Sequence, residues 1–451
     1  MSEIIQASDI RDEQARLENV ISDLLAEAKS QGASAAEAGV NLSAGYSVTA
    51  RLGEVETIEH DRDGGLGVSV YFGQSKGSAS TSDLSPEAIR DTVTAACNIA
   101  RYTSKDKCAG LADAELMATE TPDLDLYHPW KLSIDEAIGQ AIECEAAARD
   151  FDSRVINSEG ASISTHRGVT LYGNSHGFLG GYAGTRHSVS CSVIAKQDDS
   201  MERDYWYSAD RVPDRLESMA DIGRKAAERS VNRLQPRKLT TRQAPVVFQA
   251  DIATSLLRSF IGAIRGAAIY RESSFLLDAM GKPVFPGWVH IHENPRLPRE
   301  AGSAAFDNEG VATRAQDFIR DGVLQGWVLD SYAARKLGLR TTGNAGGVRN
   351  LRIDPSAELE LPGLLKEMES GLLVTELMGQ GVNPVTGDYS RGAAGYWVEN
   401  GQIQYPVSEI TVAGNLRDMF MNLRAVGSDI DRRGGTQSGS WLVDDMMIAG
   451  E

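Results

Sequence analysis

The order of helix and strand patterns in the first half of the chain constrains its fold most. Apolar residues recur every three or four positions over 17–28, which predicts a helix with one buried face. Strand-like runs follow at 46–51, 55–60 and 66–72, and the last of them alternates apolar and polar residues strictly. Ser85-Pro86-Glu87 then begins a second helix, with a serine N-cap, a proline and an acidic residue in the first turn. This half of the chain is therefore predicted to pack helices on antiparallel strands.

The same order of patterns recurs further along the chain. Ser133-Ile134-Asp135-Glu136 has the sequence of a capping box and begins a helix that is predicted to extend to about residue 149. Strands are predicted at 155–165, 169–172 and around 189–195, and a further helix at 214–234. The recurrence of helix, strands and helix predicts a pseudo-repeat.

The second half of the chain has fewer helix signals. Gln235-Pro236-Arg237-Lys238 marks a boundary, so we predict an N-terminal domain at 1–235 and a C-terminal domain at 236–451. Asn400-Gly401 lies between two strand-like runs and predicts a two-residue β-hairpin. The 45 glycines outnumber the 14 prolines, and many lie at predicted turns such as Asp63-Gly64-Gly65. We therefore expect an α+β fold whose C-terminal half is mostly antiparallel β.

Charge and composition exclude several classes of function. The chain has 45 Lys+Arg and 63 Asp+Glu, which gives a net charge of −18. An acidic balance of this size argues against an extended nucleic-acid footprint and against binding to an anionic membrane surface. The sequence shows neither a targeting signal, an apolar stretch of membrane-spanning length, nor a CxxC pair among its four cysteines. We expect a cytoplasmic protein with reduced thiols.

Two stretches match the Gly-x-Ser-x-Gly pattern of serine hydrolases. They are Gly73-Gln74-Ser75-Lys76-Gly77 and Gly173-Asn174-Ser175-His176-Gly177. A nucleophile elbow needs a strand before the serine and a helix directly after it, and neither stretch is followed by a helix pattern. Both are therefore interpreted as glycine-rich hairpin tips.

The histidines leave one weak candidate for a metal site. Zinc-binding helices place histidines four or five residues apart, and the seven histidines contain no such pair. His290 and His292 are two apart, so on a strand they would share a face, and Glu293 is adjacent. A metal ion at this pair is one hypothesis, and ordinary strand histidines are the favoured alternative.

The segment 378–397 is the most distinctive part of the sequence. It combines many glycines with polar side chains and two aromatic residues. Such loops let the main chain of a ligand approach closely, whereas a long turn with Asx and Ser/Thr capping explains the same composition. The residues predicted to bind substrate here are Asn383, Thr386, Asp388, Ser390 and Arg391.

Several motifs, in order, resemble the TldD/PmbA family, and specifically its PmbA (TldE) branch. The segment 378–397 continues into 398–407 and 410–416, and further matches lie at 306–311 and 339–345. The resemblance covers essentially the whole chain. It implies an intracellular metallopeptidase assembly, in which TldD-type chains carry an HExxxH helix and a later cysteine that hold the metal. PmbA-type chains pair with them.

The resemblance also implies which positions of this chain match that metal site. The equivalent helix is placed within 252–264, and alignment of Leu256-Leu257 puts Arg258 and Ala263 at the two histidine positions. Ser259 then falls at the glutamate position. No cysteine or histidine follows in the tail 427–451.

Peptide hydrolysis by a bound metal requires the two histidines and the glutamate that are replaced at these positions. A guanidinium has no usable lone pair for a cation, alanine offers no ligand, and serine is a poor base. We therefore expect no catalytic residue and no metal on this chain, and a zinc or similar divalent ion on a TldD-type partner. That Arg258 pairs with an acidic group in place of the metal is a further hypothesis.

Three functions are open at this point. The favoured one is a non-metal subunit of a TldD-type peptidase that cleaves unfolded or modified peptides, with peptide-antibiotic maturation and antitoxin turnover as implied substrate classes. The second is an independent peptidase with a site at His290, His292 and Glu293. The third is a non-catalytic homodimer that binds or scaffolds peptides through 379–395.

Overall fold

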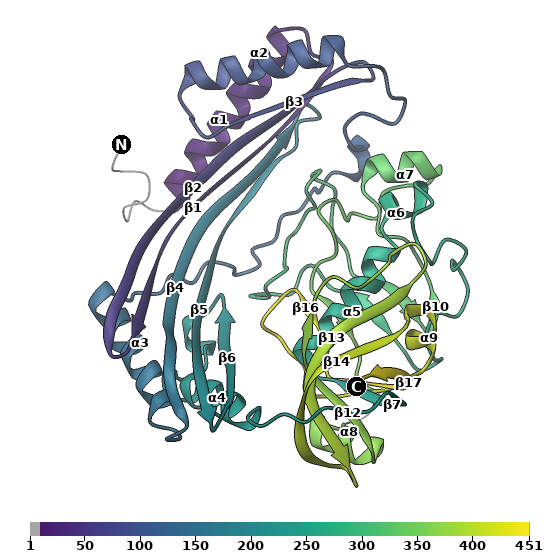
Figure 1. Ribbon diagram of the computed structural model, residues 1–451. Coiled ribbons are helices and arrows are strands. Elements are labelled where there is room, and N and C mark those ends of the chain that lie inside the picture. Colours follow the sequence, from purple (N-terminus) through teal and green to yellow (C-terminus); the bar gives the residue numbers. More distant parts are fainter. Residues whose placement is uncertain (1–9, 357, 451) are drawn as a thin grey trace.

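The first half of the chain forms one long antiparallel sheet. The computed structural model describes residues 10–356 and 358–450. Six strands are hydrogen-bonded in the order β3-β2-β1-β4-β5-β6, and the sheet is strongly curved (Figure 1). The helices cover its convex face, and the C-terminal half lies on its concave side (Figure 1). The strands are β1 (Ala35–Arg51), β2 (Glu54–Phe72), β3 (Ser75–Thr81), β4 (Val155–Asn174), β5 (Leu179–Gln197) and β6 (Ser200–Asp210).

The pseudo-repeat expected from the sequence is present. The element order is α1-β1-β2-β3-α2 and then α3-β4-β5-β6-α4, with β1 and β4 adjacent in the middle of the sheet. An apolar core lies between each pair of helices and the sheet, and strands of both units contribute to each core. The helices start where the caps predict, because Ser85 accepts a hydrogen bond from Ala88 N and the capping box at Ser133 is formed. The helices are α1 (Ile10–Ser30), α2 (Pro86–Tyr102), α3 (Ile134–Arg149) and α4 (Met219–Asn232).

The strands are longer than the sequence predicted. The expected turn Asp63-Gly64-Gly65 lies inside β2, and the runs at 46–51 and 55–60 are only the ends of β1 and β2. Gly45 and Gly64 lie inside these strands at positions where a neighbouring side chain occupies the space that a Cβ atom would need. They therefore do not end the strands. A Cβ atom at Gly64 would lie 2.4 Å from Leu42 Cδ2, and one at Gly45 would lie 2.4 Å from His166 Nδ1.

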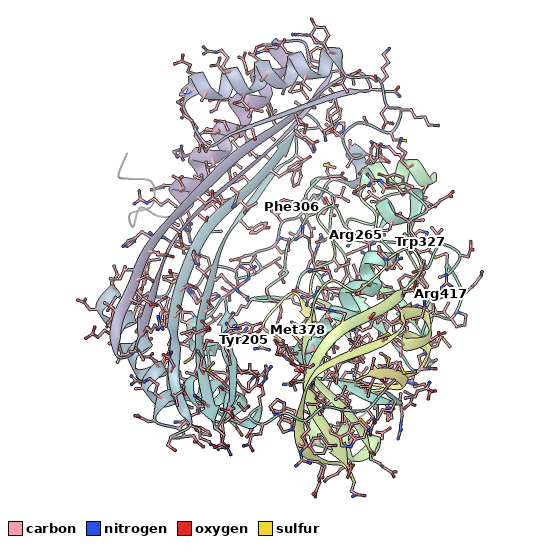
Figure 2. The ribbon with its side chains drawn as sticks, in the orientation of Figure 1. Tyr205, Arg265, Phe306, Trp327, Met378 and Arg417 are labelled. Atoms are coloured by element: carbon pink, nitrogen blue, oxygen red, sulfur yellow. The ribbon has the colours of Figure 1, made fainter. Side chains whose placement is uncertain are left out.

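A connecting segment, 103–133, runs from α2 to α3 and contacts the C-terminal half. Arg335 of α7 (Ser331–Leu337) donates hydrogen bonds to the carbonyls of Cys108, Gly110 and Leu111. Phe306 lies between the sheet and the C-terminal half (Figure 2), where its ring meets Phe178 edge-on at 5.0 Å. Phe306 belongs to an apolar cluster between the two halves, made of Ala118, Leu124, Leu126, Tyr172, Phe178, Ala305 and Phe306.

The C-terminal half is mostly antiparallel β, as expected. Its larger sheet has the order β14-β13-β12-β7-β17-β15, and a further pairing between β14 and β17 closes it into a barrel. One pair, β7 with β12, is parallel. Asn400 and Gly401, with φ of 54° and 69°, form the predicted hairpin turn. The strands are β7 (Arg242–Phe248), β12 (Gly371–Met378), β13 (Asp388–Glu399), β14 (Gln402–Asn415), β15 (Leu423–Val426) and β17 (Trp441–Ala449).

A smaller sheet and several helices complete this half. The sheet has the order β10-β9-β8-β11-β16, and α5 lies between it and the barrel, in the largest apolar core. In the described ranges, no helix is long and apolar enough to cross a bilayer. The strands are β8 (Ile291–Glu293), β9 (Gln316–Arg320), β10 (Val323–Leu324), β11 (Leu351–Ile353) and β16 (Thr436–Gln437). The helices besides α7 are α5 (Ala250–Ala263), α6 (Gly266–Tyr270), α8 (Leu361–Met368) and α9 (Leu416–Met421).

Candidate functional site

Helix α5 carries the three positions that the family resemblance aligned with a metal site. Arg258 is exposed and its Nη2 donates to Thr254 Oγ1 at 3.1 Å. Ser259 is half-buried, and its hydroxyl donates to the carbonyl of Ser255 at 3.0 Å. Ala263 is 2% exposed within the core. A guanidinium, a hydroxyl donating to a carbonyl and a buried methyl do not fit a divalent metal.

The glycine-rich segment forms a capped turn between β12 and β13. Asn383 Oδ1 accepts from Val385 N at 2.9 Å, and Thr386 Oγ1 donates to Asp388 Oδ2 at 2.6 Å. Asn415 Nδ2 donates to Asp388 Oδ1 at 3.2 Å. The Asx and Ser/Thr capping that the sequence allowed as an alternative is therefore present. The side chains of Asn383, Thr386 and Asp388 are all exposed.

Ser390 and Arg391 lie just beyond this turn, on β13. Ser390 is exposed, and its main-chain N–H donates to the carbonyl of Gly381 at 2.7 Å. Arg391 is half-buried, and its Nε has no hydrogen-bond partner among the described residues. The structure thus gathers all five predicted residues within one turn and the start of one strand. Their binding of substrate stays a prediction.

A cleft lies between the two halves, and of the segment 378–397 it is lined by Tyr396 and by none of the five predicted residues. It has a volume of about 620 Å³ and lies between α4 and β6 on one side and β12 to β14 on the other. Arg233, at the end of α4, forms an ion pair with Glu376 of β12 at 2.5 Å. Figure 2 places Tyr205 of β6 and Met378 of β12 on the facing sides of the two halves, and both are exposed. The cleft is built from segments about 130 to 200 residues apart in the chain, so no local pattern predicted it.

His290 and His292 share a face, as strand alternation predicted, but Glu293 is not with them. Glu293 is 2% exposed on the opposite face, where Asn344 Nδ2 donates to Oε1 at 2.7 Å and the N–H of Arg349 donates to Oε2 at 2.6 Å. The proposed trio of His290, His292 and Glu293 is therefore wrong, because successive residues of β8 point to opposite faces. The acids beside the histidines are Asp317 and Asp354.

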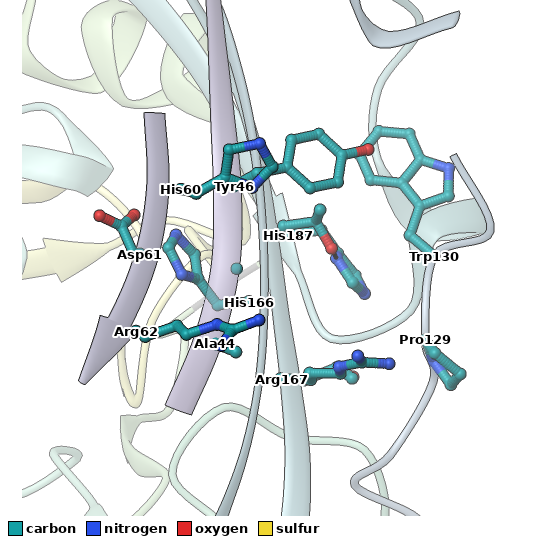
Figure 3. Close-up of a pocket in the computed structure, with 13 residues that line it drawn as sticks. Ala44, Tyr46, His60, Asp61, Arg62, Pro129, Trp130, His166, Arg167 and His187 are labelled. Carbon is teal, nitrogen blue, oxygen red and sulfur yellow. Dashed lines mark hydrogen bonds between the residues drawn. The ribbon is translucent and has the colours of Figure 1, made fainter. Parts of the chain in front are cut away.

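A pocket of about 290 Å³ lies in the middle of the long sheet (Figure 3). His187 is buried there, its Nδ1 is 2.8 Å from Thr165 Oγ1, and its Nε2 is 2.8 Å from the carbonyl of His128. Nε2 therefore donates, Nδ1 accepts, and burial lowers the pKa of this imidazole. Trp130 of the connecting segment meets the His187 ring edge-on at 5.5 Å. The remaining lining residues include Tyr46, His60, Asp61, Arg62, His166 and Arg167.

The two GxSxG stretches are hairpin tips, as interpreted from the sequence. Gly73 and Gln74 form the turn between β2 and β3. Ser175 lies in the turn between β4 and β5, where its hydroxyl accepts a hydrogen bond from Ala36 N at 3.0 Å. In the described chain, each of the two turns leads directly into a strand, so neither is a nucleophile elbow.

Two of the family-like motifs meet in the C-terminal half. Asp307 of the motif 306–311 is buried, and its carboxylate accepts from the N–H groups of Glu309, Val311 and Ala345 at 2.9–3.0 Å. Ala345 belongs to the motif 339–345. The carboxylate of Asp307 thus contacts both motifs and caps the loop of the second one.

Glu309 is expected to make the stability of the protein pH-dependent. Its Oε2 accepts from Ser331 N at 3.0 Å, and burial, aided by Asp307 and Asp330, raises the pKa of Glu309 from 4.5 to about 7. Between these values the unfolded chain loses the proton first, so stability falls as pH rises from about 4.5 to about 7. In the unmodified chain the free energy of unfolding is expected to fall by about 2 kcal/mol between pH 5 and pH 8, as measured by urea unfolding. Glu309→Gln should abolish this fall.

The matched control for this prediction is Glu54→Gln. Glu54 is exposed at the start of β2, so the pH profile of this variant is expected to follow that of the unmodified chain. If the Glu309→Gln and unmodified chains showed parallel unfolding free energies at both pH values, burial of Glu309 would not be the cause.

Comparison with known proteins shows which family this chain resembles over nearly its whole length. Family models match three consecutive stretches: PmbA/TldA metallopeptidase domain 1 at 36–100, the central domain at 127–234 and the C-terminal domain at 241–450. The metalloprotease PmbA of Escherichia coli O157:H7 is 52% identical over 446 residues, covering 98% of each chain. A metalloprotease PmbA homolog of Haemophilus influenzae is 50% identical over 441 residues, again covering 98% of each chain.

Solved structures show the same fold. A Bacteroides thetaiotaomicron protein, whose name refers to modulation of DNA gyrase, superposes with a TM-score of 0.91 at 28% identity and covers 97% of this chain and 99% of its own. TldE from Thermococcus kodakarensis superposes with a TM-score of 0.83 at 18% identity, covering 96% of this chain and 100% of its own, and at that identity it supports the fold alone. The matches of family models and of relatives over nearly the whole chain identify it as a member of the PmbA/TldD metallopeptidase family, in its PmbA branch.

Proposed function

We propose that this chain is the non-metal subunit of a cytoplasmic TldD-type metallopeptidase that cleaves unfolded or modified peptides. The observation that carries the proposal is the set of groups on α5. Arg258, Ser259 and Ala263 stand where the family resemblance places two histidines and a glutamate, and they offer neither a metal ligand nor a base. The divalent metal, zinc or a similar ion, then belongs to the partner chain.

The chemistry of peptide hydrolysis explains why one subunit of such an assembly can lack these groups. A metal polarises the scissile carbonyl and lowers the pKa of its water, and a carboxylate takes the proton. One complete set of these groups is enough for a cleavage site. We assign this chain a part in partner binding and in forming the wall of the substrate space, with the cleft between α4, β6 and β12–β14 as the surface that contacts peptide.

An extended peptide has a free strand edge available on this chain. β3 pairs only with residues 66–72 of β2, so residues 54–65 pair with β1 alone among the described strands. Their main-chain donors and acceptors on the outer side are accessible to an added strand. Val55 and Ile58 are exposed on this edge and offer apolar contacts to such a segment.

The test is reconstitution with a TldD-type partner. The two chains are purified separately, mixed at micromolar concentration, and followed by light scattering and by cleavage of a denatured, fluorescently labelled protein. We expect no cleavage by this chain alone, a defined heteromeric complex on mixing, and cleavage by that complex. A partner whose HExxxH glutamate is changed to glutamine should give the complex without cleavage.

Two outcomes would contradict the proposal. Chelator-sensitive cleavage by this chain alone would make it an independent peptidase. A homodimer that persists in excess partner would favour the scaffolding alternative, with 379–395 as its contact surface. The variant Arg258→Ala tests whether Arg258 substitutes for the charge of the metal. Unchanged assembly and activity would show that it does not.

A further inference from the structure

We propose that His290, His292 and Asp354 form a binding site for one divalent transition-metal ion, of the zinc class, on the solvent face of the smaller C-terminal sheet. This site is separate from α5 and goes beyond the proposed function, because it assigns a metal to the subunit that lacks the peptidase ligands. It does not depend on the partner chain.

The three side chains converge because of strand pairing. His290 and His292 flank Ile291, which is buried, so both imidazoles point away from the core. Asp354 follows β11, whose Ile353 pairs with Ile291 and whose Arg352 pairs with His292. The site is therefore attached to a sheet, which positions its side chains more rigidly than a loop would.

The distances suit a small cation. His290 Nδ1 lies 2.9 Å from Asp354 Oδ2, and His292 Nε2 lies 3.1 Å from Asp354 Oδ1. The ligand atoms of the three residues all lie within 4.8 Å of one another. Ligands about 2.0–2.1 Å from a tetrahedral zinc are about 3.4 Å apart, so small side-chain movements would place an ion among them.

A second carboxylate already orients one of the histidines. Asp317 of β9 lies on the other side of His290, with its Oδ1 2.9 Å from His290 Nε2. Arg320 Nε donates to Asp317 Oδ2 at 2.8 Å and holds that carboxylate in place. A carboxylate that accepts the N–H of one ring nitrogen leaves the other nitrogen as the metal ligand, which is the usual arrangement around metal-binding histidines.

The site is open enough to take up an ion from solution. The side chains of His290, His292 and Asp354 are 36%, 27% and 44% exposed, whereas Asp317 is 18% exposed. Three protein ligands and an accessible fourth position, which water can occupy, complete a tetrahedral set. Arg352 also lies near Asp354, but its Nε is 4.0 Å from Oδ1, which is too far for a hydrogen bond, so it does not occupy the carboxylate.

The experiment is a calorimetric titration of the full chain with zinc chloride, after chelator treatment and without an affinity tag. We expect one equivalent to bind. The double variant His290→Ala/His292→Ala and the single variant Asp354→Asn should each lower the affinity by at least about 100-fold, and Asp317→Asn by about 10- to 100-fold. His176→Ala, in the exposed turn between β4 and β5, should leave binding unchanged.

Titration with cobalt provides a readout of geometry, since tetrahedral cobalt has intense visible absorption bands. Circular dichroism of each variant establishes that its fold is retained. No binding of zinc by the folded chain, or binding that the double variant leaves intact, would overturn the proposal. Both results are independent of peptidase activity, so failure of this site and failure of the proposed assembly are distinguishable.

Discussion

Truncation of Trp441 to alanine is expected to lower the free energy of unfolding by about 4 kcal/mol. Trp441 is fully buried at the start of β17, and its indole N–H donates to Ser438 Oγ at 2.7 Å. Its ring meets Phe285 and Phe420 edge-on at 6.3 and 6.4 Å. The substitution leaves a large cavity where β17 joins β7 and β15, and it removes the donor to the buried hydroxyl of Ser438. Urea unfolding followed by circular dichroism measures the loss.

The control for this prediction is Trp288→Ala. Trp288 is 40% exposed, so its truncation removes less buried surface and leaves no enclosed cavity. We expect a loss of about 1 kcal/mol or less. Equal losses at the two positions would show that the aromatic cluster around Trp441 does not hold the barrel together.

The second large effect is expected for Gly395→Ala. A Cβ atom at Gly395 would lie 1.8 Å from the carbonyl oxygen of Leu373 and 3.0 Å from Val374 Cα, both on the main chain of β12. Main-chain atoms in the middle of a sheet cannot move aside independently, so β12 and β13 must separate locally. We expect a loss of about 3 kcal/mol and faster amide hydrogen exchange in β12 and β13.

Gly287→Ala is the matched glycine control. Gly287 is exposed and an added Cβ would have no atom within 4 Å. Its substitution should leave both the unfolding free energy and the exchange rates of β12 and β13 close to those of the unmodified chain. Unchanged exchange in Gly395→Ala would mean that β12 and β13 accommodate the extra atom without separating, contrary to the expected result.

The candidate sites differ in how much of each was predictable. Strand alternation alone placed His290 and His292 on one face, because the period of a strand is two residues. Their acidic partners could not be found in this way. Asp317 and Asp354 lie 27 and 64 residues beyond His290, and only the pairing of β8 with β9 and β11 brings them together.

The glycine-rich segment shows a different limit. Its composition allowed either a ligand-binding loop or a capped turn, because Asn, Thr and Asp form the same hydrogen bonds in both cases. The structure shows that Asn383, Thr386 and Asp388 cap the turn. The exposed side chains of these capping residues present polar atoms to solvent as well.

Local signals in the sequence determined the elements that depend on neighbouring residues. Serine caps at Ser85 and Ser133 begin α2 and α3, and Asn400-Gly401 makes the hairpin between β13 and β14. The order of these signals also determined the repeated helix–strands–helix unit, and the motifs around 378–416 determined the family. These features follow from short-range hydrogen bonding and side-chain periodicity, which a sequence displays directly.

Only the tertiary structure decided the rest. The extension of β2 through Asp63-Gly64-Gly65, the parallel pairing of β7 with β12 and the closure of the barrel by β14 and β17 each depend on contacts between distant segments. The same is true of the cleft between the halves and of Asp354 beside His290. Strand register and sheet closure are set by the packing of side chains across the whole core, and no window of neighbouring residues contains that information.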